Sequence, residues 1–383
     1  MQDFAFNTTR SLKVARGGAR LLADSVAAMG AWSTLVVTDP GLHSAGMLNE
    51  ALAGFAKRGL RVTVFSDVQA DPPEDVILAA AAAATACQAD CVVGFGGGSS
   101  MDVAKLAALL ARSGESLSQV YGVDQAKGPR LPLIMVPTTA GTGSEVTAIS
   151  IVTTGAGEKK GVVSPVLLPD LALLDAELTL GLPPQVTAAT GIDAMVHAIE
   201  AYTSKRLKNP ISDALAREAL RLLSGALHLA CRNGRNLQAR EDMLLGACLA
   251  GMAFANAPVA AVHALAYPIG ARFHVPHGLS NSLVLAPVMR FNLEAATPQY
   301  AQLSEIVRPG ATGTELQKAR ALTDHLAGLA GELGLPTHLR EVGISQADLA
   351  LLADDAMKQT RLLVNNPREV RREDAQALYQ EAL

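Results

Sequence analysis

The chain has few cysteines: Cys87, Cys91, Cys231 and Cys248 are the four among 383 residues. Neither a CxxC motif nor the paired spacing of a zinc ribbon occurs, which argues against a cysteine-based zinc module. We therefore interpret these cysteines as buried thiols of a protein in a reducing compartment.

Long apolar runs are also missing. No uncharged apolar stretch reaches the roughly 18 residues that a membrane helix needs. The N-terminal sequence MQDFAFNTTR lacks the basic and then apolar pattern of a secretory signal. We therefore expect a cytoplasmic protein with no membrane partner.

The charges show no basic stripe of the kind that binds a phosphate backbone. The chain carries 32 Lys and Arg residues against 36 Asp and Glu residues, interspersed, for a formal net charge of −4. Nucleic acid is therefore excluded as an expected partner. Aromatic residues make up only 4% and charged residues 18%, whereas apolar residues reach 49%. This composition is typical of a helix-rich α/β enzyme and argues against disorder.

The first half of the chain alternates short β-branched runs with helical stretches, as parallel βαβ units do. We expect an α/β domain with a parallel sheet over residues 1–182. The expected strands are 34–37, 62–65, 91–93 and 131–136, and the expected helices are 44–58, 73–86 and one from near Met101 to about Arg112.

The character of the sequence changes at Pro183 and Pro184, after which long patterns with 3.6-residue spacing replace the strand-like runs. Because 383 residues exceed the roughly 250–300 at which single cores stop growing, we predict a second, all-α domain over residues 183–383. A cleft between two such domains would suit an enzyme with two substrates. The expected helices are 186–202, 212–231, 239–255 and 313–333.

A glycine loop, in CVVGFGGGSSMDVAK, lies between a buried strand and a helix. Glycines let backbone N–H groups approach a phosphate, and the helix N-terminus attracts the anion. We interpret Gly97, Gly98 and Ser99 as part of a pyrophosphate site; the alternative is a tight turn without a ligand. The common dinucleotide spacing GxGxxG is absent.

Two further loops follow expected strands. In VVTDPG, Asp39 can accept hydrogen bonds from both hydroxyls of an adenosine ribose, and its charge would repel a 2′-phosphate, so NAD is favoured over NADP; the alternative is a plain turn residue. The loop PTTAGTGSEVT offers the hydroxyls of Thr138, Thr139, Thr142 and Ser144 to a phosphate or to the nicotinamide ribose.

Asp193 and His197 are four residues apart in TAATGIDAMVHAIEAY, so they project from one helical face. Apolar flanks indicate a buried helix, and a buried carboxylate needs a cation or several donors; the alternative is a solvent-facing pair. Further on, AAVHALAYPIGARFHVPHGLSN supplies His263, His274 and His277. One carboxylate with three imidazoles suits Fe(II), Zn or another divalent ion, and the spacing leaves open whether His274 or His277 completes the set.

The motifs GGGSSMDVAK, PTTAGTGSEVT, GIDAMVHAIEAY, FHVPHGLSN and NNPR with a final helix span essentially the whole chain. Together they resemble the iron-containing (group III) alcohol dehydrogenases, which have the dehydroquinate synthase-like fold. The resemblance implies a homodimer, and metal ligands at Asp193, His197, His263 and His277. It also implies cofactor contacts at Asp39, Gly97, Gly98, Ser99, Asp102, Thr138, Thr139, Thr142 and Lys160.

One residue departs from the family pattern. The family often carries a histidine four residues after the third ligand, where HALAY places Tyr267. A phenol can pass a proton, but its reference pKa of about 10 makes it a poorer base near neutrality. With the ligand His263, we predict catalytic roles for Tyr267 and for Phe254, which would form an apolar wall that selects short chains.

The resulting hypothesis is hydride transfer between NAD(H) and a small primary alcohol or aldehyde that a divalent metal activates. Three alternatives stand beside it. A lyase of the dehydroquinate synthase type would need more basic residues for its phosphate-bearing substrate, and a metal-free reductase of the maleylacetate type would lack the complete Asp and His set. A noncatalytic NAD-binding protein would leave the buried ligand cluster unexplained.

Overall fold

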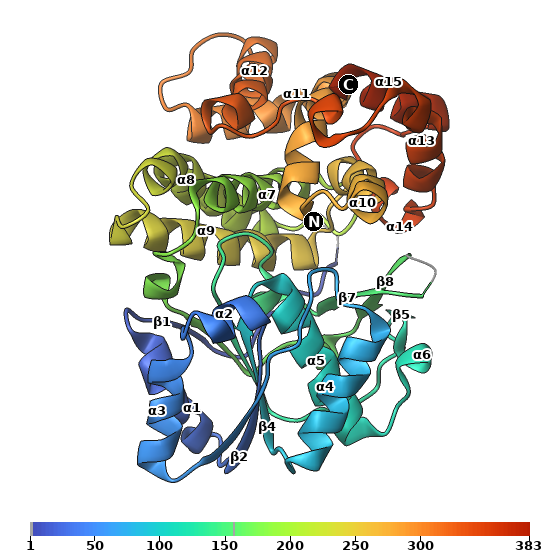
Figure 1. The fold of residues 1–383 in the computed structure, drawn as a ribbon. Helices are drawn as coiled ribbons and strands as arrows, with labels where there is room; N and C mark the ends of the chain where they lie inside the picture. Colours follow the sequence, from blue (N-terminus) through green and yellow to red (C-terminus); the bar gives the residue numbers. More distant parts are fainter. Residues whose placement is uncertain (1–2, 156–157) are drawn as a thin grey trace. The chain divides into compact units, whose positions relative to one another are not determined.

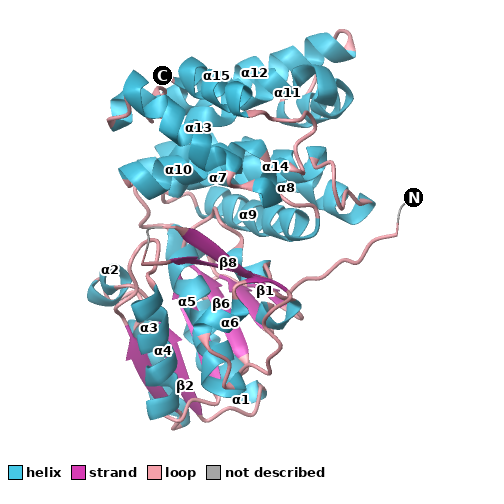
Figure 2. Cartoon of the chain, turned by 90° about the vertical axis from the view of Figure 1, so that its right-hand side faces the viewer, coloured by secondary structure: helices cyan, strands magenta, loops and turns pink. Residues whose placement is uncertain are grey.

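A computed structural model describes residues 3–155 and 158–383 of the chain. The chain forms two compact units, with the break between Gly181 and Leu182, and residues 3–6 group with the C-terminal unit. Figures 1 and 2 show that every strand among the described residues belongs to the N-terminal unit, whereas the C-terminal unit is helical. The predicted fold class, a parallel α/β domain followed by an all-α domain, is confirmed.

The N-terminal unit is built on a six-stranded sheet in which all the neighbouring strands run parallel. Its strand order is β1-β9-β6-β4-β2-β3. The strands are β1 (Leu12–Val14), β2 (Ser33–Val37), β3 (Arg61–Phe65), β4 (Cys91–Gly96), β6 (Leu133–Pro137) and β9 (Leu171–Leu174).

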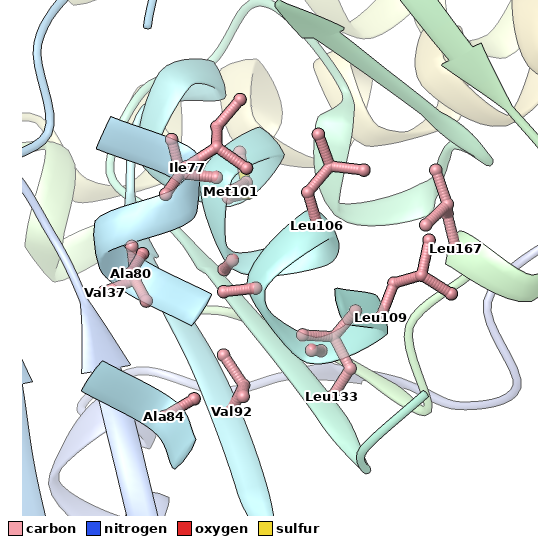
Figure 3. Packing of buried hydrophobic residues seen from close by; sticks show 14 of the residues in the cluster. Val37, Ile77, Ala80, Ala84, Val92, Met101, Leu106, Leu109, Leu133 and Leu167 are labelled. Atoms are coloured by element: carbon pink, nitrogen blue, oxygen red, sulfur yellow. The ribbon is translucent and has the colours of Figure 1, made fainter. Parts of the chain in front are cut away.

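Both faces of this sheet are covered, because side chains alternate along each strand. Val92 of β4 joins one apolar cluster, with residues of α4 and α5 (Figure 3). Its neighbour Val93 joins a second cluster on the opposite face, with Leu22 of α1 and Phe55 of α3. The helices are α1 (Leu22–Ala28), α2 (Pro40–Ser44), α3 (Asn49–Arg58), α4 (Glu74–Ala86), α5 (Gly98–Ser113) and α6 (Leu117–Val120).

A second, three-stranded sheet in the same unit has the order β5-β8-β7. It comprises β5 (Gly122–Val123), β7 (Ile149–Thr153) and β8 (Lys159–Val163). Strands β7 and β8 are antiparallel, and β5 pairs with β8 in parallel. This sheet packs against α5 through β7.

The C-terminal unit packs α8, α9 and α11 around α7. Helix α7 is buried without a break over residues 192–203, as its apolar sequence predicts. The helices are α7 (Pro184–Thr203), α8 (Pro210–Arg232), α9 (Leu237–Asn256), α10 (Ala261–Phe273), α11 (His277–Val307), α12 (Glu315–Glu332), α13 (Leu349–Met357), α14 (Thr360–Leu363) and α15 (Arg372–Ala382).

Among the described residues, no single helix has both the length and the apolar character needed to cross a membrane. Only α9 and α10 taken together meet that test, and the pair is bent by 106°.

Three local expectations were wrong. The single helix expected over residues 44–58 is two helices, because Asp39 and Pro40 begin α2 early and Gly46, at a φ of +69°, interrupts the chain before α3. Helix α5 begins at Gly98, earlier than Met101. Not all the thiols are buried: Cys87 and Cys231 are only partly covered. Among the described residues, none of the four cysteines forms a disulfide.

Candidate metal centre and cofactor-binding loops

Four candidate metal ligands come from three helices of the C-terminal unit. Asp193 and His197 lie one turn apart on α7, His263 lies in the first turn of α10, and His277 is the first residue of α11. One ligand atom from each lies within 4.8 Å of the others. We call these four residues the Asp/His cluster.

The cluster is compact and mostly buried, with Asp193 at its centre. Asp193 Oδ1 lies 3.6 Å from His277 Nε2 and 3.9 Å from His263 Nε2. Burial alone would raise the pKa of the Asp193 carboxyl, but the three neighbouring imidazoles outweigh it and hold this pKa below its usual value. An anionic carboxylate among three imidazoles is a donor set that suits a divalent cation such as iron or zinc.

Glu200, which the sequence analysis missed, lies one turn beyond His197 on α7 and contacts His263. Its Oε2 atom is 2.6 Å from His263 Nδ1, and its Oε1 accepts a hydrogen bond of 2.7 Å from the backbone N–H of Val262. The carboxylate therefore joins α7 to the start of α10 at the position of the third candidate ligand.

Asn281, one turn after His277 on α11, was also missed. It is fully buried, and its Nδ2 donates to Asp193 Oδ1 at 2.6 Å while lying 3.3 Å from both His263 Nε2 and His277 Nε2. Its Oδ1 has no hydrogen-bond partner among the described residues. One carboxylate oxygen and two imidazole nitrogens thus lie around a single buried atom, and such a convergence of possible ligand atoms fits a cation site.

The start of α11 is held against α7 by a glycine. A Cβ atom on Gly278 would lie only 2.4 Å from the carbonyl oxygen of Ala189, and 3.3 Å from the Cβ of Asp193. No side chain fits there unless the backbone moves. The close approach of the two helices thus places His277 next to Asp193.

Aromatic rings line the less buried side of the cluster. Phe254 stacks on His197 with ring centroids 4.3 Å apart, and Tyr267 lies 5.8 Å from the ring of His277. Phe254, Tyr267 and His277 are each partly exposed, whereas the other three members of the cluster are buried. Aromatic rings therefore border the part of the cluster that is least covered by protein.

In the N-terminal unit, the predicted cofactor loops share one edge of the six-stranded sheet. Strands β6, β4 and β2 are parallel neighbours, so their carboxyl ends lie side by side. Thr138 follows β6, Gly97 follows β4 and Asp39 follows β2. Asp39 also caps α2 by accepting a hydrogen bond of 2.9 Å from the backbone N–H of Leu42, the role of a turn residue that the sequence left open.

The glycine loop around Gly97 packs directly on the loop PTTAGTGSEVT, which we call the threonine loop. A Cβ atom on Gly98 would lie 2.9 Å from Thr142 Cγ2. Gly96 takes a φ of +154°, which side-chain-bearing residues rarely adopt, and a Cβ there would lie 2.6 Å from Ser100 Oγ. Loop packing therefore favours glycine at both positions whether or not a phosphate binds. The loop leads into α5, whose first-turn N–H groups include that of Ser99.

The ion pair of Lys105 and Asp102 on α5 holds the threonine loop through hydrogen bonds. Lys105, fully buried on α5, donates to Ser144 Oγ, Thr147 Oγ1 and the carbonyl oxygen of Ile149 at 2.7 to 3.1 Å. Asp102, one turn earlier on the same helix, accepts from Ser144 Oγ at 2.6 Å. Its other oxygen accepts from the backbone N–H of residue 151 at 2.9 Å. Asp102 is therefore already bonded within the protein, and the importance of Lys105 was not predicted.

Comparison with known protein families decides the class of this chain. The family described as "Iron-containing alcohol dehydrogenase" matches residues 10–176, and the one described as "Fe-containing alcohol dehydrogenase family, C-terminal" matches residues 187–383. The chain belongs to the iron-containing alcohol dehydrogenase family. The predicted family and enzyme class are thereby confirmed.

Relatives of this alcohol dehydrogenase cover its full length. It is 40% identical over 365 residues to long-chain-alcohol dehydrogenase 1 of Geobacillus thermodenitrificans (strain NG80-2). The matched region covers 94% of this chain and 92% of the relative. A crystal structure of 1,3-propanediol oxidoreductase matches with a TM-score of 0.96 at 33% identity, covering 100% of both chains. Sulfoacetaldehyde reductase from Bifidobacterium kashiwanohense, solved with NAD⁺, matches with a TM-score of 0.90 at 29% identity, covering 100% of this chain and 99% of the other.

Two predicted site residues of this alcohol dehydrogenase belong neither to the Asp/His cluster nor to the loops at the edge of the six-stranded sheet. His274, which the sequence left open as a ligand, is exposed at the end of α10 with a φ of +54°, outside the Asp/His cluster. Lys160 lies exposed on β8 of the small sheet, with its Nζ 5.6 Å from the centre of the Tyr121 ring. A cofactor contact by Lys160 therefore remains a prediction.

Proposed function

We propose that this chain transfers a hydride between NAD(H) and a small primary alcohol or its aldehyde, using divalent iron held by Asp193, His197, His263 and His277. The observation that carries the proposal is the convergence of these four side chains, from three helices, on one point in the C-terminal unit. Family membership supports the alcohol dehydrogenase activity and the choice of iron. The NAD⁺ complex of a structural relative supports the cofactor.

When bound, the ion supplies a Lewis acid that stabilises negative charge on the substrate oxygen. The protein side chains would hold the ion and position the substrate. Asp193 contributes a carboxylate whose lowered pKa keeps it anionic, and the imidazoles contribute lone pairs without added negative charge. Phe254 and Tyr267 border the less buried side of the cluster. Phe254 would form an apolar wall that restricts the substrate to short chains, and Tyr267 would pass a proton.

The cofactor contacts are proposed at the shared sheet edge of the N-terminal unit. The first turn of α5 offers backbone N–H groups to the pyrophosphate. The second oxygen of the Asp39 carboxylate, the one that does not cap α2, would accept from the adenosine ribose and disfavour a 2′-phosphate. The full proposed set is Asp39, Gly97, Gly98, Ser99, Asp102, Thr138, Thr139, Thr142 and Lys160.

Residues 1–182 are accordingly proposed as the dinucleotide-binding domain and residues 183–383 as the metal and substrate domain. We also propose a cytoplasmic homodimer. The absence of disulfides among the four described cysteines supports a reducing compartment, and the dimer follows from the family resemblance.

A panel of alcohols assayed by NADH absorbance tests the proposed function. We expect turnover of short primary alcohols with NAD⁺ and much less with NADP⁺. Removal of the metal by a chelator should abolish turnover, and Fe(II) added without oxygen should restore it. Turnover that survives complete metal removal would refute the metal role, and NADH binding without turnover of any alcohol would indicate a noncatalytic protein.

Tyr267→Phe tests whether the phenol passes a proton, because it removes only the hydroxyl group. We expect kcat to fall by about 10²-fold, the lower range for loss of a proton-transfer group, with metal content unchanged. Steady-state kinetics and elemental analysis measure the two quantities. A variant as active as the wild-type enzyme would exclude Tyr267 from the proton path.

The matched variant Tyr267→His should shift the pH profile of alcohol oxidation. A base acts in its unprotonated form, and the reference pKa of histidine is about 6.5 against about 10 for tyrosine. The rise of kcat/KM with pH should therefore move to lower pH in this variant.

A further inference from the structure

Glu200 is a buried carboxylate whose two oxygens are both used by α10. Only 5% of its side chain is exposed. Oε1 accepts from the backbone N–H of Val262 at 2.7 Å, and Oε2 lies 2.6 Å from His263 Nδ1. No other carboxylate in the described part of the chain is recorded within 4.0 Å of His263 except Asp193, on the opposite ring nitrogen.

These contacts define which nitrogen of His263 carries the proton. A carboxylate only accepts hydrogen bonds, so Nδ1 donates to Glu200, and in the neutral ring, the form that binds a metal, the lone pair is then on Nε2. A second contact agrees: the Nδ2 of Asn281, which only donates, lies 3.3 Å from His263 Nε2. The nitrogen that faces Asp193 is therefore the one with a lone pair.

The backbone contact fixes the helix that carries His263. Val262 lies in the first turn of α10, where backbone N–H groups have no partner within the helix. The Glu200 carboxylate satisfies one of them, and its charge interacts favourably with the positive end of the helix dipole. A single side chain of α7 thus sets both the position of α10 and the ring orientation of its histidine.

We propose that Glu200 is a positioning residue that holds His263 as an Nε2 ligand and so tightens metal binding by the Asp/His cluster. This inference rests on the proposed function, because it assumes that the cluster binds a metal. Carboxylates behind metal-bound histidines typically contribute 10–100-fold to metal affinity.

Nitrogen-15 NMR of the histidine side chains in the zinc-loaded wild-type protein tests the proton position directly. Zn²⁺ is chosen because it is diamagnetic, and the His263 signals are assigned by their loss in His263→Gln. We expect a proton on Nδ1 and metal on Nε2 of His263. Metal on Nδ1, or a proton on Nε2, would overturn the proposal without any variant of Glu200 being needed.

Glu200→Gln tests the energetic contribution, because glutamine has the same shape but carries an N–H donor that can face Nδ1 and favour the wrong tautomer. We expect Zn²⁺ affinity, measured by competition with a chelator, to weaken by about 10–100-fold, while NADH affinity and far-ultraviolet circular dichroism stay at the wild-type values. An affinity within twofold of wild type would refute the role of Glu200.

Thr203→Val is the matched control for general loosening of α7. Thr203 is buried one turn beyond Glu200, and its hydroxyl donates to the carbonyl oxygen of Ile199 at 2.9 Å. The control should keep Zn²⁺ affinity, and an equal loss there would show that the Glu200 effect is merely structural. If the wild-type protein itself bound no Zn²⁺, the proposed function would fail first, which separates the two failures.

Discussion

Replacing His263 with alanine is expected to lower alcohol turnover by at least about 10³-fold while leaving NADH binding within twofold of wild type. The substitution removes one of four converging donors. The several kcal/mol that a bound metal contributes to stabilising charge on the substrate oxygen would be lost with it. NADH binding should persist because its proposed contacts lie in the N-terminal unit. Elemental analysis measures the metal content, steady-state kinetics the turnover, and NADH fluorescence titration the affinity for NADH.

His274→Asn is the matched control for this experiment. His274 directly follows the same helix as its C-cap and is exposed, outside the Asp/His cluster. Asparagine tolerates its positive φ. The control should keep both metal and turnover. Full activity in a metal-free His263→Ala enzyme would contradict the proposed role of the cluster.

Lys105→Met is expected to destabilise the N-terminal unit by about 3–5 kcal/mol, the range for removing one partner of a buried ion pair. Three acceptors lose their donor, and Asp102 is left without its nearby cation, at 3.7 Å in the wild-type chain. Denaturant unfolding followed by hydrogen exchange of β7 would localise the loss. Adding Asp102→Asn should recover part of it, because the unpaired charge is then gone.

Lys159→Met provides the comparison, since its ion pair has a half-exposed partner, Asp71, and is expected to contribute no more than about 1 kcal/mol. An equal effect of both substitutions would contradict the buried-pair argument.

The pH dependence of stability gives a second test of Lys105. Burial lowers the pKa of Lys105 from 10.5 to about 8 in the folded chain. Between these values the unfolded chain binds more protons, so the contribution of this group to stability should rise with increasing pH. The rise should be missing in Lys105→Met. A rise of the same size in the variant would assign it to other groups.

The strands that the sequence predicted well are those rich in β-branched residues. Val92 and Val93 of β4 are typical, and the strand is found where it was expected. Strand β9, with the sequence LALL, was missed because four apolar residues fit a buried strand or a helix equally well. The break between α2 and α3 was missed because its cause is a left-handed Gly46 inside a stretch of helical length.

The candidate site was predictable where chemistry and spacing coincide. Asp193 and His197 stand at i and i+4 of an apolar helix, so their shared face followed from the sequence. The choice between His274 and His277 depended on tertiary structure, because it is set by where α10 ends and α11 begins. Glu200 was missed although its spacing of seven from Asp193 places it on the same face; a charged residue amid an apolar run was the available signal.

Lys105 illustrates a signal that sequence alone cannot resolve. A lysine on a helix is usually a solvated residue, and here its partners are contributed by residues about forty positions later in the chain. The sequence predicts the helix that carries Lys105, but it does not predict which residues pack against the buried face of that helix.

Gly278 lies so close to the backbone of α7 that it cannot be replaced, whereas other residues around the Asp/His cluster can be. Any side chain at position 278 would drive one donor away from the others, so directed evolution should find this position closed to change. Phe254 borders the same centre but is only partly covered, and no proton transfer is proposed for it. Libraries that vary position 254 and keep Gly278 should therefore yield enzymes for other alcohols that still bind the ion.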